Sequence, residues 1–427
     1  MAIAILFGVM IALLLLGVPV AFALIAASLA TVLYLDLPSI IVVQQTVAGA
    51  NTASLIAIPL FIFAGELMMR GGISERLIAF AASLVGHMRG GLGQVNVLAS
   101  LLFGGVSGSA IADVSAIGGT MIPQMVQRGF DRDFAVNVSM TAAIVALLVP
   151  PSHNLILYSA AAGGSIPIAD LFAAGVVPAL LLTAVLLVVA WVVARRRGYG
   201  VDPFPGWAMV VRRMVAAMPG LLLVALIFIG IRAGVFTAVE SASIAVVYAL
   251  LITILVYRRM NWAAFLETCS GAVRTMGLIL FVIGSAACFG WLLAYLQVPT
   301  AAVHMMTELT TNKYLMLLML VVVLLMIGTF MDLAPLIIIC TPIFLPVAKA
   351  IGVDPIHFGV ILILKGGIGL ITPPVGSVLF VGTAIGKISV TDALKTIWPF
   401  YLAALAVLLI VVFVPQLSLW LPALMRS

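Results

Sequence analysis

Long apolar stretches recur along almost the entire chain, and they constrain its fold more than any other feature of the sequence. A helix needs about 20 mainly apolar residues to cross the hydrocarbon core of a bilayer. These stretches do not alternate polar and apolar residues, as the strands of a membrane barrel do. We therefore predict an all-α polytopic membrane protein. Uninterrupted runs of spanning length lie at about 3–34, 51–69, 171–194, 214–232, 236–257, 275–295 and 396–421.

Charged residues are scarce enough to exclude a soluble protein. Asp, Glu, Lys and Arg make up 8% of the 427 residues, whereas a soluble domain carries about 25%. The sequence also contains no H-E-x-x-H, Walker A or G-x-S-x-G motif. We therefore predict a protein that is not an enzyme, holds no cofactor and is driven by an ion gradient.

Two more segments of spanning length are interrupted near their middle by proline pairs. We predict broken helices at about 133–165 and 355–386, interrupted by Pro150-Pro151-Ser152 and Thr372-Pro373-Pro374. Proline has no backbone N–H and clashes with the preceding helical turn, so a regular helix does not continue through such a pair. Together with the uninterrupted runs, the broken helices make nine predicted crossings.

Two remaining apolar segments, at about 90–127 and 314–350, carry a polar or glycine break near the middle. We predict that each is a re-entrant helical hairpin, with its tip at Ser107-Gly108-Ser109 or at Gly328-Thr329. The first arm of the second hairpin would span only ~21 Å, which is too short to cross the membrane. For the first hairpin, two ordinary spans joined by a tight turn are an alternative.

The distribution of Lys and Arg predicts the orientation. With a cytoplasmic N-terminus, 15 of these residues fall on the inside and 4 on the outside, and the triple Arg195-Arg196-Arg197 lies inside. Cytoplasmic loops favour Lys and Arg, so we predict a cytoplasmic N-terminus and a periplasmic C-terminus. The same rule explains the net charge of +6, which we do not interpret as nucleic-acid binding.

The two halves of the chain share an ordered set of motifs. A Gly-Ser or Gly-Thr tip, an Asp, a proline pair, a second Asp and a further Pro follow one another in both halves. One extra crossing between the halves inverts the second, and inverted repeats with interrupted helices are typical of secondary transporters. We predict an ion-transporter-type elevator fold with a first repeat at 1–194, a cytoplasmic loop and linking helix at 195–235, and a second repeat at 236–427.

The helix breaks are the predicted ion sites. A break leaves carbonyl and amide groups without partners, so it persists in a membrane only where something else satisfies them. Freed carbonyls and hydroxyls suit Na⁺, and half-helix N-termini suit an anion. An alternative is that the breaks are structural kinks lined by small residues. The two predicted Na⁺ sites comprise Ser107, Gly108, Ser109, Pro151 and Ser152 in the first half, and Gly328, Thr329, Thr372, Pro373 and Gly376 in the second.

Further polar residues beside the breaks are candidates for substrate binding or for support of the ion sites. Asp113 and Asp332 follow the hairpin tips, where a carboxylate caps a helix or binds an ion. Lys365 is a cation inside the membrane, which marks it as functional. It either binds the carboxylate of a substrate or pairs structurally with Asp332 or freed carbonyls, or else it replaces one Na⁺ as a built-in charge. The full set is Asn154, Asp113, Asp332, Lys365 and Ser377.

A series of short motifs resembles the large permease subunit of tripartite ATP-independent periplasmic (TRAP) transporters, over essentially the whole chain. The motifs are Ile58-Pro59-Leu60-Phe61, Ala64-Gly65-Glu66-Leu67-Met68, Gly71-Gly72, Gly90-Gly91-Leu92, Ser107-Gly108-Ser109-Ala110 with Asp113, Pro150-Pro151-Ser152, and Thr372-Pro373-Pro374-Val375-Gly376. The resemblance implies Na⁺-coupled import of a small organic acid by an elevator motion. It also implies a bacterial inner-membrane location, a separate four-helix membrane subunit, and a periplasmic binding protein that delivers the substrate. The alternative function is a self-sufficient divalent-anion/Na⁺ symporter.

Overall fold

A computed structural model of the chain describes residues 1–51, 53–310 and 312–426, which form helices and contain no strand. Positions 52, 311 and 427 belong to the predicted repeats but lie outside the described residues. The prediction of an all-α polytopic membrane protein is confirmed. By length and composition, five described helices can cross a membrane, or up to eight if each bent pair is one span, against nine predicted crossings. The five are α11 (Ile168–Arg196), α12 (Trp207–Arg232), α13 with its π turn (Ala238–Val256), α14 (Trp262–Tyr295) and α17 (Leu333–Ala350).

The first hairpin and the first broken helix lie where the sequence places them. The hairpin turns at Gly108, whose φ of 58° ends the first arm. Neither Pro150 nor Pro151 can donate a backbone hydrogen bond, so the broken helix stops before them and restarts at His153. The pieces are α6 (Gly91–Ser107), α7 (Ala110–Asp113), a π turn η2 (Val114–Gly118) and α8 (Gly119–Gln127), then α9 (Arg132–Ala143), η3 (Ile144–Leu147) and α10 (His153–Ala161).

The second half repeats this sequence of elements. The second hairpin consists of α16 (Lys313–Gly328) and α17, and the second broken helix consists of α18 (Pro355–Leu370) and α19 (Ser377–Gly386). Their bounds agree with the segments predicted at 314–350 and 355–386. The inverted relation between the two halves, and the repeat boundaries, stay predictions.

Both ends of the chain contain a helix break that the apolar pattern does not predict. The predicted crossing at 3–34 is wrong as a single helix, because it forms α1 (Ala2–Leu15) and α2 (Val20–Tyr34), which pack together. Gly17 adopts a φ of 78° two residues after the end of α1, and Pro19 lacks an N–H, so the chain turns between the two helices. The predicted crossing at 396–421 is likewise divided, into α21 (Trp398–Phe413) and α22 (Gln416–Arg426), which are bent by 54°.

The remaining helices complete the chain. The predicted crossing at 236–257 is α13 (Ala238–Leu251) continued by η4 (Ile252–Val256), and no apolar run predicts α5. The predicted crossing at 275–295 is the second part of a longer helix, the 34-residue α14, which begins at Trp262. The other elements are α3 (Ile40–Ala50), η1 (Ala53–Ile56), α4 (Ala57–Arg70), α5 (Ile73–Val85), α15 (Val298–Leu309) and α20 (Val390–Thr396).

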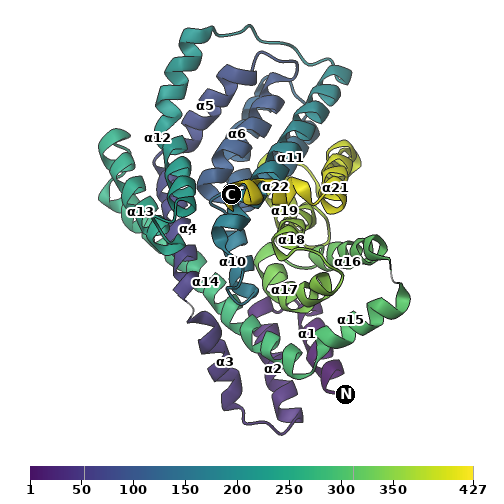
Figure 1. Cartoon of the computed structure of the whole chain (residues 1–427). Helices are drawn as coiled ribbons and strands as arrows, with labels where there is room; N and C mark the ends of the chain where they lie inside the picture. Colours follow the sequence, from purple (N-terminus) through teal and green to yellow (C-terminus); the bar gives the residue numbers. More distant parts are fainter. Residues whose placement is uncertain (52, 311, 427) are drawn as a thin grey trace.

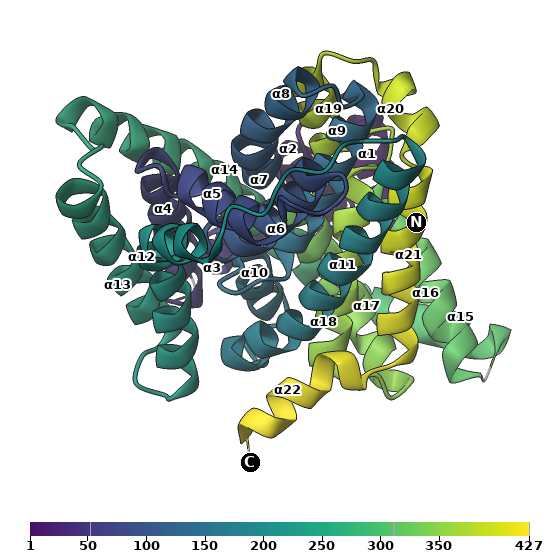
Figure 2. The ribbon, with the colours of Figure 1, turned by 90° about the horizontal axis from the view of Figure 1, so that it is seen from above.

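The helices pack in two sets of neighbours, one around α14 and one around the broken helices. In Figure 1, α14 runs diagonally from the side of α13 toward α15, and it packs along α2, α3, α4 and α17. Seen from above, α12 and α13 lie on one side of the molecule and α16 and α21 on the other (Figure 2). The hairpins pack on the broken helices, with α6 against α9 and with α16 and α17 against α18. We call the hairpins, the broken helices and α11 the hairpin unit.

Helix α18 connects the two halves inside the hairpin unit, and glycine makes this contact close. A Cβ on Gly359 would lie 2.3 Å from the ring of Tyr158, and a Cβ on Gly367 would lie 2.6 Å from Ile144. The Tyr158 hydroxyl donates a hydrogen bond of 2.6 Å to the carbonyl of Pro355. Small residues allow membrane helices to approach closely, so α18 lies directly against the first broken helix.

Candidate ion-binding site

The first hairpin tip and the first helix break touch each other, and we call this contact junction 1 (residues 107–109 and 150–154). A Cβ on Gly108 would lie 3.0 Å from the carbonyl oxygen of Pro151 and 3.2 Å from the Cα of Ser152. Asn154 Nδ2 donates a hydrogen bond of 3.0 Å to the carbonyl of Gly108. Junction 1 therefore brings together the residues that the sequence predicts for the first Na⁺ site.

The hydroxyl groups of junction 1 support the local backbone. Ser109 Oγ accepts a hydrogen bond from the N–H of Ala112 at 3.3 Å and caps α7. Ser107 Oγ accepts one from the N–H of Ser109 at 3.5 Å, and Ser152 Oγ donates one to the carbonyl of Leu147 at 2.7 Å. A hydroxyl has two acceptor lone pairs, so these oxygens keep capacity for a cation.

Asp113 adds a buried carboxylate next to junction 1. Its side chain is 1% exposed, and Oδ2 accepts a hydrogen bond of 2.7 Å from Ser100 Oγ. Its other oxygen, Oδ1, has no hydrogen-bond partner within the described part of the chain. An unpaired carboxylate is costly to bury, and a bound cation would compensate it. The oxygen atoms of junction 1 and of Asp113 therefore fit Na⁺, which prefers oxygen ligands.

The second tip and the second break also meet, at junction 2 (residues 328–332 and 372–377). The N–H of Val375 donates to the carbonyl of Thr329 at 3.1 Å. Ser377 Oγ donates to Asp332 Oδ1 at 3.2 Å. Asp332 Oδ1 also accepts from the N–H of Leu333, so Asp332 caps α17.

Three of the residues predicted for the second ion site, Thr329, Thr372 and Gly376, form hydrogen bonds within their own tip or break. Thr372 Oγ1 donates to the carbonyl of Ile368 at 2.7 Å, and the N–H of Gly376 donates to the carbonyl of Thr372 at 3.2 Å. Thr329 Oγ1 donates to the carbonyl of Met326 at 2.8 Å. As at junction 1, the backbone and hydroxyl oxygens of one tip and one break share a small volume.

Lys365 is fully buried on α18 at junction 2. Its side chain is 0% exposed, and a Cβ on Gly328 would lie 2.8 Å from its Nζ. Among the described residues, no acceptor forms a hydrogen bond with this Nζ. The predicted support residues are thus divided between the junctions, with Asn154 and Asp113 at the first and the others at the second.

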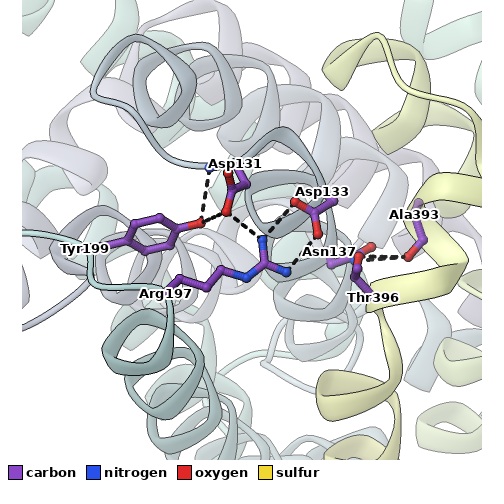
Figure 3. Close-up of polar contacts among 7 residues, drawn as sticks. All are labelled: Asp131, Asp133, Asn137, Arg197, Tyr199, Ala393 and Thr396. Carbon is purple, nitrogen blue, oxygen red and sulfur yellow. Dashed lines mark hydrogen bonds and ion pairs between the residues drawn. The ribbon is translucent and has the colours of Figure 1, made fainter.

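A polar cluster at the start of α9 was missed by the sequence analysis (Figure 3). Arg197, at the end of α11, forms an ion pair with Asp133 at 2.8 Å and with Asp131 at 2.9 Å. Tyr199 donates to Asp131 at 2.7 Å. The hydrogen bond to Asp133 is the main reason why the pKa of the Arg197 guanidinium is raised above its usual value. The sequence predicts for Arg197 only a part in the orientation signal, because Asp131 and Asp133 lie 66 and 64 positions away along the chain.

The polar cluster extends to the second half through Asn137 on α9. Asn137 Nδ2 donates to the carbonyl of Ala393 at 3.0 Å and to Thr396 Oγ1 at 2.9 Å (Figure 3). Both acceptors lie on α20, so the cluster joins α9 and α11 to the segment that follows the second broken helix.

Removing the guanidinium of this cluster is expected to lower the stability of the folded protein. Arg197→Ala leaves two carboxylates without their charged partner, and hydrogen bonds to charged groups contribute about 1.5–3 kcal/mol. We expect a lower thermal unfolding temperature in detergent. Arg196→Ala, one residue earlier and exposed, is the control and should unfold like the wild type. Equal unfolding temperatures for both variants would show that the cluster contributes nothing to stability.

Comparison with known proteins identifies the family. Residues 7–417 match the family described as "Tripartite ATP-independent periplasmic transporter, DctM component". The chain belongs to this family. The TRAP permease is thus a membrane protein and one component of a transporter, and the alternative of a self-sufficient symporter is set aside.

Relatives agree over nearly the full length of the TRAP permease. The 2,3-diketo-L-gulonate TRAP transporter large permease protein YiaN of Escherichia coli is 34% identical, covering 98% of both chains. The C4-dicarboxylate TRAP transporter large permease protein DctM of Rhodobacter capsulatus is 35% identical, covering 99% of both. The sialic acid TRAP transporter large permease protein SiaM of Vibrio cholerae is 36% identical, covering 96% of this chain and 95% of that protein.

A solved structure shares the fold. The crystal structure of the Alcanivorax borkumensis YdaH transporter aligns with a TM-score of 0.62 at 16% identity, over 87% of this chain and 86% of that chain. At this level of identity the likeness concerns the fold alone.

Proposed function

We propose that the TRAP permease imports a small organic acid together with Na⁺ by an elevator motion. The observation that carries this proposal is junction 1, where a hairpin tip contacts a helix break and is followed within one helical turn by Asp113, a buried carboxylate with an unpartnered oxygen among the described residues. Family membership makes the protein a transporter component. In this proposal junction 1 binds the coupling ion. The three relatives named above are described as handling organic acids, which supports a carboxylate substrate.

The packing around the hairpin unit supports the elevator part of the proposal. A cavity of about 250 Å³ lies where α14 and α3 face α10 and α17. It is lined largely by small residues, among them Gly49, Ala160, Ala287 and Gly290. Packed helices can slide over one another in domain motions, and small side chains with a cavity between them leave room for this. In this proposal α14 belongs to the fixed frame and the hairpin unit moves.

The partners and the location follow from the tripartite family. We propose a bacterial inner-membrane complex with a separate four-helix subunit and a periplasmic binding protein that delivers the acid. The N-terminus would be cytoplasmic and the C-terminus periplasmic, because 15 Lys and Arg residues then lie inside and 4 outside.

Uptake by the reconstituted complex tests the proposed function. Proteoliposomes containing both membrane subunits, with the binding protein added outside, would receive radiolabelled dicarboxylates, sugar acids or sialic acid. An inward Na⁺ gradient should drive accumulation of one of these acids, and replacing Na⁺ by choline should stop it. Accumulation that is equally fast in choline would exclude Na⁺ as the coupling ion.

A single hydroxyl at junction 1 provides a graded test. Ser107→Ala removes one candidate oxygen ligand, so the apparent Na⁺ affinity of uptake should fall by about tenfold, the equivalent of one neutral hydrogen bond of about 1.4 kcal/mol. Ser115→Ala is the matched control on the same hairpin, because its exposed hydroxyl bonds only to the carbonyl of Ile111. Identical Na⁺ dependence in the two variants would contradict a role for Ser107 as a ligand.

A further inference from the structure

The surroundings of Lys365 resemble a cation site that is already filled. Its ammonium lies against Gly328, the last residue of α16, and close to the thiol of Cys340 on α17. The C-terminal end of a helix carries a partial negative charge and favours cations. Lys365 Nζ therefore places a positive charge beside the C-terminal end of α16, without a hydrogen bond to any described carbonyl.

Glycine on both helices makes room for this ammonium. A Cβ on Gly328 would come within 2.8 Å of Lys365 Nζ, and a Cβ on Gly369 would come within 2.5 Å of the carbonyl oxygen of Gly328. Lys365 and Gly369 are one helical turn apart on α18, so they share the face that meets the hairpin tip. The tip and α18 thus enclose the charged group between them.

The two junctions differ in their charge. Eight residues before the proline pair, where the second half has Lys365, the first half has Ala142, which is also fully buried. Both junctions have a carboxylate nearby, but Asp113 Oδ1 has no partner among the described residues, whereas Asp332 Oδ1 at junction 2 accepts two hydrogen bonds. Within the described residues, junction 1 therefore has an unpartnered carboxylate oxygen nearby, whereas a lysine ammonium lies against junction 2.

Burial argues against direct contact between Lys365 and a transported acid. The side chain is 0% exposed, and a substrate that enters from water would have to separate the hairpin tip from α18 to reach it. Asp332, the acidic residue of the tip, is engaged by Leu333 and Ser377. The ammonium therefore has no carboxylate partner among the described residues and lies beside the C-terminal end of α16.

We propose that the ammonium of Lys365 is the resident cation of junction 2, so that the TRAP permease binds Na⁺ at junction 1 and no second Na⁺ at junction 2. The inference rests on the proposed Na⁺ coupling, and it decides between the two roles that the sequence left for this lysine. A fixed charge holds the tip on the break in every step of the cycle, whereas an exchangeable Na⁺ would leave with each substrate. Transport would therefore couple to fewer ions than two equivalent junctions allow.

Na⁺-dependent thermal unfolding of the purified full-length protein tests this assignment without requiring transport. An ion that binds only the folded state raises the free energy of unfolding in proportion to the logarithm of the ion concentration. The slope of that free energy against the logarithm gives the number of bound ions. The wild type should show the slope of one ion. Lys365→Asn replaces the ammonium by a side-chain oxygen and free space, and its slope should increase by about one ion.

Two further variants separate charge from ligation. Lys365→Met removes the charge but supplies no oxygen and leaves little space, so its slope should stay at the wild-type value. Lys349→Asn, an exposed lysine on the same hairpin, should also behave like the wild type. A two-ion slope in the wild type would overturn the proposal even if Lys365→Asn fails to fold.

The failure of this inference is distinguishable from failure of Na⁺ coupling itself. An unchanged slope in a folded Lys365→Asn variant overturns the inference while leaving junction 1 and Na⁺-driven uptake intact. A wild type that ignores Na⁺ contradicts the proposed coupling ion, and a Na⁺ response gained by Lys365→Asn alone would still support the role of the lysine.

Discussion

Asp113→Ala is expected to abolish Na⁺-driven uptake at ordinary Na⁺ concentrations. A carboxylate and a Na⁺ ion about 4 Å apart attract each other by about 4 kcal/mol at an effective dielectric constant of about 20. Loss of that attraction corresponds to an affinity for Na⁺ that is at least about a hundredfold weaker. The measurement is uptake by the reconstituted complex as a function of Na⁺ concentration.

Thermal unfolding distinguishes this loss of ion binding from misfolding. Asp113 is a buried carboxylate with a free oxygen among the described residues, so its removal should not destabilise the ion-free protein. In Na⁺-free buffer, Asp113→Ala should unfold at or above the wild-type temperature, and added Na⁺ should no longer stabilise it.

Two variants complete the test of Asp113. Ser100→Ala removes the hydroxyl that donates to the carboxylate at 2.7 Å but keeps the charge, so it should have a much smaller effect on Na⁺ affinity. Asp202→Asn removes an exposed carboxylate that pairs with Arg128 and should leave Na⁺ dependence unchanged. Normal Na⁺ stabilisation of Asp113→Ala would place the ion elsewhere.

Gly369→Ala is expected to separate the second hairpin from α18 and to stop transport. The new Cβ would lie 2.5 Å from the carbonyl oxygen of Gly328 and 3.0 Å from its carbonyl carbon. Both atoms belong to the backbone of the hairpin tip, so no side chain can rotate away. Overpacking of this kind costs about 1–3 kcal/mol, and here the displacement also disrupts junction 2.

The matched control is Gly277→Ala in the middle of α14, where a Cβ would meet nothing within 4 Å. Because alanine favours a helix interior over glycine by about 0.5–1 kcal/mol, this variant should unfold at the wild-type temperature or slightly above it. Gly369→Ala should unfold earlier and show no uptake. Wild-type uptake by Gly369→Ala would mean that the tip does not pack on α18 as closely as the structure has it.

The sequence by itself determined that this protein lies in a lipid bilayer, and it determined most of the places where its helices break. Scarce charge and long apolar runs require a bilayer, and proline pairs interrupt a helix wherever they occur because they cannot donate a hydrogen bond. The same local signals were present at Gly17, Pro19 and Pro415, which separate α1 from α2 and α21 from α22. They were missed because apolar composition continues unchanged across these turns.

The tertiary structure alone decided how closely each tip contacts its break and which charges remain unpaired. The repeat pattern predicts that Gly108 and Pro151 belong to one site, but it cannot show that Lys365 lies against Gly328 without a hydrogen-bond partner in the described chain. Arg197 illustrates the same limit, since its ion pair with Asp133 joins residues 64 positions apart. Local sequence fixes where a helix can begin or end, whereas the neighbours of a buried group depend on how distant helices pack, and that packing gives each buried charge its role.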